Sequence, residues 1–211
     1  GLATAPGIVA SKEVWNKSPE KIIEAAYPFG FPLFVKPANS GSSKGTCKVK
    51  NASELSRAID FALQYDDKAL VEKAIIGREI ECAVLEKDGE VIASPVGEIK
   101  IVGDHEFYDF EAKYAPGGSK HLLPAPIKPF VYQEARRLAL MAHRALGCRG
   151  VTRADFRYDD RSEGAEGLVC LEVNTQPGMT ETSLVPELAI HAGLTFEELV
   201  RWMAEDASLN R

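Results

Sequence analysis

An apolar run near the C-terminal end of the chain, Leu168 to Val173, restricts the fold more than any other feature. It has the length and composition of a β-strand, and Pro177-Gly178 gives a strong turn signal shortly after it. Glu172 and Asn174 interrupt the apolar pattern. Because alternate residues of a strand point to the same side of a sheet, these two polar side chains share one face. The pattern therefore indicates a strand with one face that is either solvated or functional.

A second strand pattern, residues 150–159, carries Arg153 and Asp155 with the same spacing. If the two strands pair as a hairpin, three oxygen ligands and one guanidinium project from one sheet surface. Mg²⁺ prefers oxygen ligands and takes only one or two carboxylates when phosphate oxygens complete its shell. Asp155, Glu172 and Asn174 supply that set. The alternative is a solvated outer face on which Arg153 forms a salt bridge with Glu172.

A loop of small residues, "ANSGSSKG", follows a short strand that ends near Lys36. Backbone N–H groups and the hydroxyls of Ser42 and Ser43 can surround a phosphate, with the lysine as a point charge. The loop is not of the GxxxxGK[ST] type, because the lysine precedes the glycines. A plain turn is the alternative interpretation.

Charged residues also gather where the first part of the chain gives way to a more strand-rich part. Glu72 and Lys73 end one strand pattern, and Glu79 begins the next. Mononucleotides bind in crevices of this kind, with backbone at the adenine edge and a carboxylate on the ribose hydroxyls. Surface charges at strand ends are the alternative.

Residues 103–128 form a long irregular stretch with several aromatic residues, prolines and glycines. A loop of this length inside a compact domain is usually functional or disordered. Lys113 and Tyr114 lie beside Gly117-Gly118, which could act as hinges of a lid that excludes water. A disordered insertion is the alternative.

Helix and strand patterns alternate along the chain, which predicts an α+β architecture of two lobes. Helices are expected at about 18–27, 51–63, 129–146, 186–192 and 195–206, with strands between them. We place the small lobe at residues 1–74 and the large lobe at residues 75–211. A length of 211 residues is ample for this arrangement.

Composition excludes several classes of protein. The net charge of −6 argues against broad binding to nucleic acid or to anionic membranes. No apolar stretch is long enough to span a bilayer. The four cysteines include no CxxC pair, so a zinc site or a disulfide framework is not expected, and reduced thiols in a cytosol fit better.

Taken together and in this order, these stretches resemble the C-terminal ATP-grasp portion of the D-alanine–D-alanine ligase family. The resemblance covers essentially the whole chain and rests on "VKPANSGSSKG", "EAKY…GGSKHLLPAP", "RADF" and "LEVNTQPGMTETSLVPE". It implies an ATP-grasp fold with ATP bound between two α+β lobes, in a cytoplasmic enzyme of peptidoglycan precursor synthesis. One D-alanine would be phosphorylated to an acyl phosphate, which the amine of a second D-alanine attacks.

The resemblance also implies roles for residues at matching motif positions. The expected nucleotide contacts are Lys36 and Lys73 on the α and β phosphates, Ser43 in the serine loop, Glu72 with the backbone of Ala74 and Ile75 at adenine, Glu79 on the ribose, and Lys113 on the γ-phosphate. Asp155, Glu172 and Asn174 would ligate two Mg²⁺ ions, for which Mn²⁺ can substitute.

The remaining implied roles concern the reacting groups. Arg153 and the N–H of Gly178 would stabilise the oxyanion of the tetrahedral intermediate. Ser42 and Tyr114 would link the serine loop to the lid, and Ser183 with Leu184 would bind the carboxylate of the second D-alanine. The lid motif "EAKY" resembles ligases that form a dipeptide rather than a depsipeptide, so D-alanine is favoured as the second substrate.

One departure from the family pattern concerns the N-terminal side. Family members carry a further N-terminal domain that supplies a carboxylate near the first D-alanine and another lysine that contacts ATP, and this chain opens at Gly1 without them. We expect the chain to bind Mg-ATP but to ligate poorly or not at all alone, and we expect the full-length protein to form a homodimer. Another ATP-grasp carboxylate–amine ligase and a non-catalytic nucleotide-binding module are the alternatives.

Overall fold

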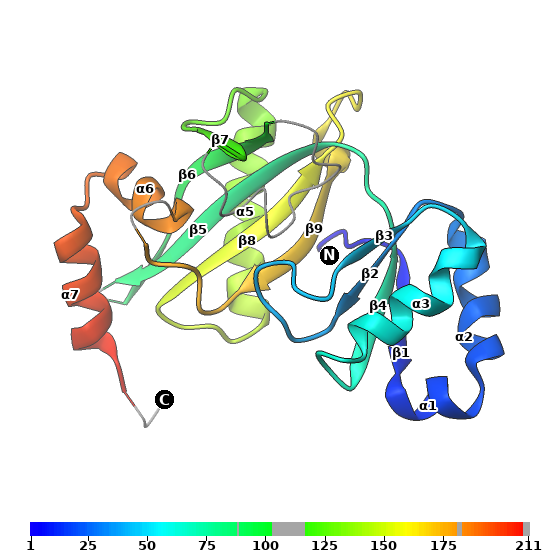
Figure 1. Ribbon diagram of the computed structural model, residues 1–211. Coiled ribbons are helices and arrows are strands. Elements are labelled where there is room, and N and C mark those ends of the chain that lie inside the picture. Colours follow the sequence, from blue (N-terminus) through cyan, green and yellow to red (C-terminus); the bar gives the residue numbers. More distant parts are fainter. Residues whose placement is uncertain (88, 103–116, 181–182, 209–211) are drawn as a thin grey trace. The chain divides into compact units, whose positions relative to one another are not determined.

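The computed structural model describes residues 1–87, 89–102, 117–180 and 183–208 (Figure 1). Contacts between Cα atoms divide the chain into two compact units, and each is described here by itself. The smaller unit comprises Ala5–Ile75 and residues 101–119, and the larger one comprises Gly1–Thr4, Ile76–Lys100 and residues 120–211. Within the described residues, no helix is both long and apolar enough to cross a membrane.

The smaller unit is a four-stranded antiparallel sheet with helices on one face. Its elements are β1 (Gly7–Ser11), α1 (Lys12–Lys17), α2 (Pro19–Ala26), a 3₁₀ turn (Tyr27–Phe29), β2 (Leu33–Pro37), β3 (Cys47–Val49), α3 (Ala52–Ala62) and β4 (Lys68–Lys73). The strand order is β1-β4-β2-β3. Leu33, Val35 and Val71 point to the helices and form the core with Leu55 and Ile59 of α3. The opposite face is therefore available for polar residues.

Helix starts in this unit follow local sequence signals. The side chain of Ser11 accepts a hydrogen bond from Val14 N at the start of α1, and Asn51 accepts one from Ser53 N at the start of α3. Pro19 occupies the first turn of α2, where its missing N–H costs nothing. Helix α1 was not predicted from the sequence, because six residues are too few for a visible apolar period.

The larger unit is built on a five-stranded sheet. Its elements are β5 (Arg78–Lys87), β6 (Glu90–Ile101), β7 (Ser119–Leu122), α5 (Pro129–Ala145), β8 (Val151–Tyr158), a 3₁₀ turn (Ala165–Gly167), β9 (Leu168–Asn174), α6 (Leu184–His191) and α7 (Phe196–Asp206). The strand order is β7-β6-β5-β8-β9. The hairpins β5–β6 and β8–β9 confirm the predicted pairings. Strand β7 is a correction, since residues 119–122 fall in the stretch that was expected to be irregular.

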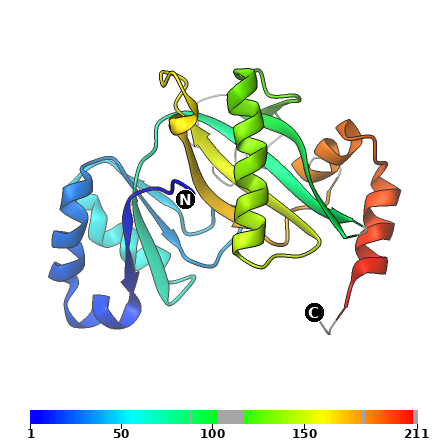
Figure 2. The ribbon, with the colours of Figure 1, turned by 180° about the vertical axis from the view of Figure 1, so that it is seen from behind.

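Two helical layers cover different parts of the large sheet. Helix α5 lies along one face (Figure 2), where Val131 and Ala135 pack against Ile80 and Phe156. Helices α6 and α7 cover only one end of the other face, through contacts of Leu188 and its neighbours with the apolar ends of β5 and β8. The rest of that second face carries charged side chains, among them Glu81 and Asp155.

A β-bulge at Leu171 decides which residues of β9 reach the polar face. In the register with β8, Phe156 pairs with Cys170 but Asp155 pairs with Glu172, so Leu171 is an extra residue. Without it, strict alternation would place Glu172 and Asn174 on the same side as Cys170, in the core beneath α5. The bulge moves both polar residues to the opposite face.

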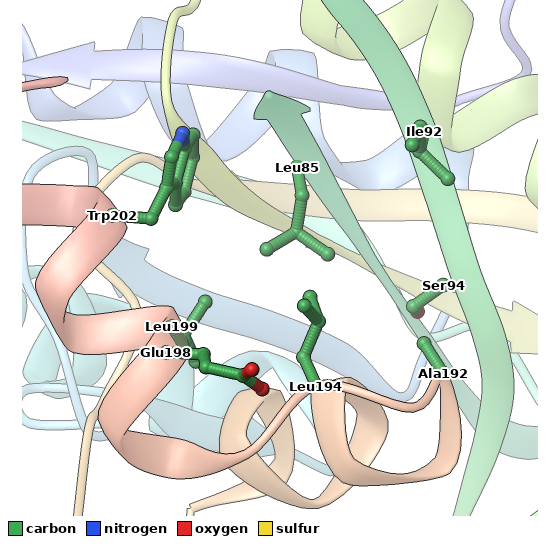
Figure 3. A pocket seen from close by; sticks show the side chains of 8 residues that line it. All are labelled: Leu85, Ile92, Ser94, Ala192, Leu194, Glu198, Leu199 and Trp202. Atoms are coloured by element: carbon green, nitrogen blue, oxygen red, sulfur yellow. The ribbon is translucent and has the colours of Figure 1, made fainter. Parts of the chain in front are cut away.

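A pocket beneath α7 is apolar and contains none of the predicted site residues. Its volume is about 210 Å³, and Figure 3 shows Trp202, Leu199, Leu85 and Ile92 around it. Glu198 also lines it, but its carboxylate accepts a hydrogen bond from Thr195 N in the capping box of α7. The pocket therefore belongs to the packing of α6 and α7 against β5 and β6.

His143 makes the stability of the larger unit depend on pH. It is buried on α5, and its Nδ1 lies 2.8 Å from Thr152 Oγ1. Burial lowers the pKa of His143, an effect that Glu86 opposes and Arg144 reinforces. The folded state thus favours neutral His143, whereas the unfolded chain takes up a proton as the pH falls through the ordinary value of 6.5.

The free energy of unfolding is therefore expected to fall as the pH drops below about 6.5, with a slope of up to about 1.4 kcal/mol per pH unit from this group. Above that pH, His143 adds no pH dependence to the free energy of unfolding. Urea unfolding between pH 5 and pH 8, followed by Trp202 fluorescence in a Trp15→Phe background, measures it. His143→Gln should flatten the curve below pH 6.5 relative to the parent, and parallel curves would contradict the prediction.

Candidate functional site

Four of the predicted site residues form two cross-strand pairs on the polar face of the large sheet. In the β8–β9 ladder, Asp155 lies opposite Glu172 and Arg153 lies opposite Asn174. Side chains of directly opposed residues are close neighbours on one face of an antiparallel pair. The hairpin and the bulge thus bring together an arginine, two carboxylates and an amide, as the sequence pattern predicted.

Hydrogen bonds join all four of these side chains. Arg153 donates from Nε to Asp155 Oδ1 (2.7 Å) and from Nη2 to Asp155 Oδ2 (2.8 Å). Asn174 donates from Nδ2 to Asp155 Oδ2 at 2.9 Å and to Glu172 Oε1 at 3.5 Å. The Asn174 amide thus lies between the two carboxylates. The salt bridge foreseen for a solvated face, Arg153 with Glu172, is replaced by the bidentate pair of Arg153 with Asp155.

The charge of Arg153 is set by its buried surroundings. Burial alone would lower its pKa, but the negative charges of Asp155, Glu81 and Glu172 and the hydrogen bond to Asp155 outweigh burial and raise the pKa above the ordinary value. Asp155 itself is only 6% exposed. The guanidinium is consequently a permanent cation at the base of the polar face, suited to stabilise negative charge on a bound group.

Strand β5 adds acidic residues to the same face. Glu79, predicted as the ribose ligand, forms an ion pair with Arg157 at 3.0 Å, and Arg157 also donates to the carbonyl of Gly77. Glu81 lies directly opposite Asp155 in the β5–β8 ladder and 2.7 Å from Arg153. Sequence reasoning missed Glu81. The alternation of "REIECAVLE" places it on the face of Glu79, but the pattern does not reveal which residue of β8 it meets.

The donor set on β8 and β9 fits a hard divalent cation such as Mg²⁺. Asp155 and Glu172 offer carboxylate oxygens. The Asn174 amide nitrogen contacts both carboxylates, and rotation of the amide by half a turn would place the amide oxygen in that position instead. Within the described part of the chain, no cluster of three or more His, Cys, Asp or Glu side chains is placed to hold a metal. A cation here would thus have two carboxylates and an amide from the protein, a set that leaves positions for phosphate oxygens.

The turn after β9 is tightly folded around Gly178 and Ser183. A Cβ atom added to Gly178 would lie 2.9 Å from Ser183 Oγ, so a larger residue there would displace the Ser183 hydroxyl. Ser183 Oγ accepts a hydrogen bond from Thr180 N at 3.0 Å, and Ser183 is the N-cap of α6. Leu184 is buried against β5, so only its backbone is available to a ligand.

In the smaller unit, the structure brings Lys36 and Glu72 together. They lie on the face away from the helices, on neighbouring strands, with Nζ and Oε2 3.0 Å apart. Lys73 is exposed at the last position of β4 and, by alternation, belongs to the opposite face of the strand. Ala74 donates its N–H to the carbonyl of Pro32, so an adenine contact there would have to use the Ala74 carbonyl, and Ile75 follows it outside the strand.

The serine loop has an unusual backbone. Ser42 and Ser43 have φ values of 55° and 56°, in the left-handed region, where non-glycine residues are uncommon. Thr46 N donates to the carbonyl of Ser43, which tightens the loop. Two successive left-handed serines cost about 1–2 kcal/mol each, and such strain is concentrated at ligand-binding segments. The strained backbone favours a ligand-binding loop over a plain turn, and the phosphate contacts of Ser42 and Ser43 stay a prediction.

Two predicted site residues, Lys113 and Tyr114, lie outside the described residues, as does most of the predicted lid. The described residues next to this stretch are Val102 and Gly117. The roles of Lys113 and Tyr114, including the link between Tyr114 and Ser42, stay predictions.

Comparison with known proteins identifies the family of the chain. Residues 1–205 match the family model described as "D-ala D-ala ligase C-terminus". A D-alanine–D-alanine ligase of Rhodopseudomonas palustris (strain BisB18) is 59% identical over 182 residues, which are 85% of this chain and 57% of that protein. One from Chelativorans sp. (strain BNC1) is 48% identical over 213 residues, 100% of this chain and 67% of that protein. The chain thus spans little more than half the length of the first of these relatives.

Solved structures show the same fold. The VanG D-Ala:D-Ser ligase of Enterococcus faecalis superposes with a TM-score of 0.78 at 33% identity, over 97% of this chain and 57% of that one. The D-alanine–D-alanine ligase of Bacillus anthracis gives 0.74 at 27% identity, over 97% and 61%. Two antiparallel sheets with their helices, in this order along the chain, define the ATP-grasp class of α+β folds. Within that class, the chain belongs to the D-alanine–D-alanine ligase C-terminal family.

Proposed function

We propose that this chain is the ATP- and Mg²⁺-binding part of an ATP-dependent D-alanine–D-alanine ligase that makes a peptidoglycan precursor in the cytoplasm. The observation that carries the proposal is the register of β8 and β9, which pairs Asp155 with Glu172 and Arg153 with Asn174 on one polar face. Membership of the family supports the reaction. We take residues 1–74 as the small lobe and residues 75–211 as the large lobe. The change of unit between Ile75 and Ile76 supports this boundary, although Gly1–Thr4 group with the larger unit and residues 101–119 with the smaller one.

The smaller unit supplies the proposed nucleotide contacts. Lys36 and the loop of Ser42 and Ser43 bind phosphates, and Lys73 reaches the phosphates from the exposed end of β4. Glu72 and the backbone at 74–75 bind adenine. Adenine and the phosphates are at opposite ends of ATP, so Lys36 and Glu72, whose side chains lie 3.0 Å apart, would contact different parts of the nucleotide. From the larger unit, Glu79 takes the ribose hydroxyls.

The larger unit supplies the proposed reaction site. Asp155, Glu172 and Asn174 hold two Mg²⁺ ions, which when bound neutralise the charge of the phosphoryl group. Transfer of that group to a D-alanine carboxylate gives the acyl phosphate and ADP. The amine of a second D-alanine, oriented through its carboxylate by Ser183 and Leu184, then attacks the carbonyl carbon. Arg153 and the Gly178 N–H stabilise the resulting oxyanion, and inorganic phosphate leaves.

Calorimetric titration of the chain with ATP, with and without Mg²⁺, tests the nucleotide site. Binding that needs Mg²⁺ is expected, and equal binding without it would favour a non-catalytic nucleotide-binding module. The chain alone is expected to show little ligation. A coupled assay of ADP release with D-alanine that gave the turnover of a complete ligase would overturn that expectation.

The identity of the second amino acid distinguishes the proposed activity from a related one. The structural similarity to a D-Ala:D-Ser ligase favours testing D-serine beside D-alanine. In a full-length ligase carrying this segment, D-alanine is expected to be the better second substrate, as judged by kcat/KM in ADP release and by the dipeptide formed. A preference for D-serine or for another amino acid would replace the proposed substrate and leave the ATP site in place.

A further inference from the structure

Glu81 is a buried acid at the centre of the polar face to which neither the family resemblance nor the metal site assigns a role. It lies on β5 and is 2% exposed. Its register partner on β8 is Asp155, so two carboxylates face each other across neighbouring strands. Like charges directly opposite on a sheet destabilise it, and burial increases the penalty. A residue that served packing alone would avoid this position.

Arg153 lies between the two acids and interacts differently with each. It gives both Nε–H and Nη2–H to Asp155 as hydrogen bonds. Glu81 Oε2 is also 2.7 Å from Nε, but because that N–H is directed at Asp155, the contact with Glu81 is an electrostatic one. Asp155 therefore holds the guanidinium through hydrogen bonds, and Glu81 lies beside it.

Binding of a metal changes this balance. Asp155 is a proposed metal ligand, and a carboxylate that ligates a divalent cation shares its lone pairs and its charge with that cation. The hydrogen bonds that Asp155 accepts from Arg153 weaken as a result. Glu172 is a proposed ligand as well, and it is exposed at the end of the site. Glu81 is the remaining acid beside Arg153 in the described structure that has no part in the proposed metal set.

We propose that Glu81 is a positioning residue for Arg153: it takes over the guanidinium Nε when Asp155 turns to the metal and so keeps the Nη groups directed at the reacting carbonyl oxygen. This inference rests on the proposed function, because it needs Asp155 at the metal and Arg153 at the oxyanion. It explains why a second buried acid faces Asp155. It also predicts that Glu81 affects the chemical step more than the binding of ATP.

The same sheet offers a matched control in Glu98. This residue is equally buried, 2% exposed, and pairs with Arg78 through two hydrogen bonds of 2.9 and 2.6 Å. It lies opposite Ile80, on the face that carries α5, away from the metal ligands. Glu98→Gln removes a buried charge from an arginine pair without touching the site.

The first test compares Glu81→Gln, Glu81→Asp and Glu98→Gln in a full-length ligase that carries this segment. Glu81→Gln is expected to lower kcat by roughly 10- to 100-fold, the range for a residue one step removed from the reacting groups, with KM for ATP changed less than about 2-fold. Glu81→Asp should recover part of kcat. Glu98→Gln should lower the melting temperature and leave kcat unchanged. Equal kcat for the two Gln variants, or a loss confined to KM for ATP, would overturn the proposal.

The second test uses the chain itself and does not depend on turnover. The ¹H–¹⁵N resonance of the Arg153 Nε group is followed while ATP and Mg²⁺ are added. In the parent it is expected to shift and stay sharp, because Glu81 replaces Asp155 as its partner. In Glu81→Gln it should broaden or exchange rapidly with water once Mg²⁺ is present. A resonance that stays sharp in Glu81→Gln would overturn the proposal.

Failure of the proposed function and failure of the Glu81 proposal give different results. If the parent chain bound ATP equally with and without Mg²⁺, the proposed function would fall, and the Glu81 proposal with it. If the parent required Mg²⁺ but Glu81→Gln behaved like Glu98→Gln, only the Glu81 proposal would fall.

Discussion

Asp155→Asn is expected to abolish the Mg²⁺-dependent part of ATP binding, with a loss of roughly 100-fold or more in Mg²⁺ affinity, the upper end of the range for a mutated group that only supports a ligand. The substitution keeps the size of the side chain but removes the charge that a hard cation requires. It also replaces one of the two acceptor oxygens that bind Arg153 and Asn174 with an N–H donor. Calorimetric titration with ATP at several Mg²⁺ concentrations measures the effect. The binding that remains without Mg²⁺ should change little.

A matched control for this variant is Asp159→Asn. Asp159 binds Arg161 in the same two-bond manner, at 2.8 and 2.7 Å, and the two residues are again two positions apart. Most of the Arg161 side chain is exposed, and neither residue belongs to the proposed metal set. The Asp159→Asn substitution should therefore leave ATP binding unchanged. If Asp155→Asn and Asp159→Asn bound Mg-ATP equally well, Asp155 would not be a metal ligand.

Gly77→Ala is expected to destabilise the larger unit by about 3 kcal/mol, from overpacking and from backbone strain together. Gly77 has a φ of 150°, and a Cβ there would lie 2.4 Å from the carbonyl oxygen of Tyr158. The carbonyl belongs to the last residue of β8, so the strand itself has to shift. Urea unfolding followed by Trp202 fluorescence, in a Trp15→Phe background, measures the loss.

Gly147→Ala separates the two causes of that loss. Gly147 also has a positive φ, 63°, but nothing lies within 4 Å of the added Cβ. It follows the C-cap of α5, where a left-handed glycine ends the helix, so alanine should cost only about 1 kcal/mol. Equal losses at the two positions would mean that the contact with Tyr158 does not restrict Gly77.

Much of the fold could be predicted because most of its helices and strands have local sequence signals. The stripe of Val131, Ala135 and Leu138 identified α5, and alternation identified both strands of the β5–β6 hairpin. Helix α1 and strand β7 were missed because they have six and four residues, too few for a periodic pattern. What stabilises them lies elsewhere in the chain, as when Trp15 of α1 donates a hydrogen bond to Asp60 of α3.

Only part of the candidate site could be predicted. Asp155, Glu172, Asn174 and Arg153 could be grouped because two strands of a hairpin need no distant partner to be placed. Lys36 and Glu72 were assigned separate roles, and only the pairing of β2 with β4 shows that they meet. The left-handed conformation of Ser42 and Ser43 had no sequence signal, because serine, unlike glycine, does not favour a positive φ.

By itself, the sequence determined the types of element, the polar composition of β8 and β9, and through its motifs the family. These depend on local propensity, alternation and residue identity. The tertiary structure alone decided which side of the sheet Glu172 and Asn174 face. Strict alternation places them with Cys170 in the core, and one extra residue at Leu171 reverses them, because a shift of one position turns every following side chain to the other face. The same structure decided that Glu81 lies opposite Asp155, since register between distant strands is set by the packing of the whole sheet.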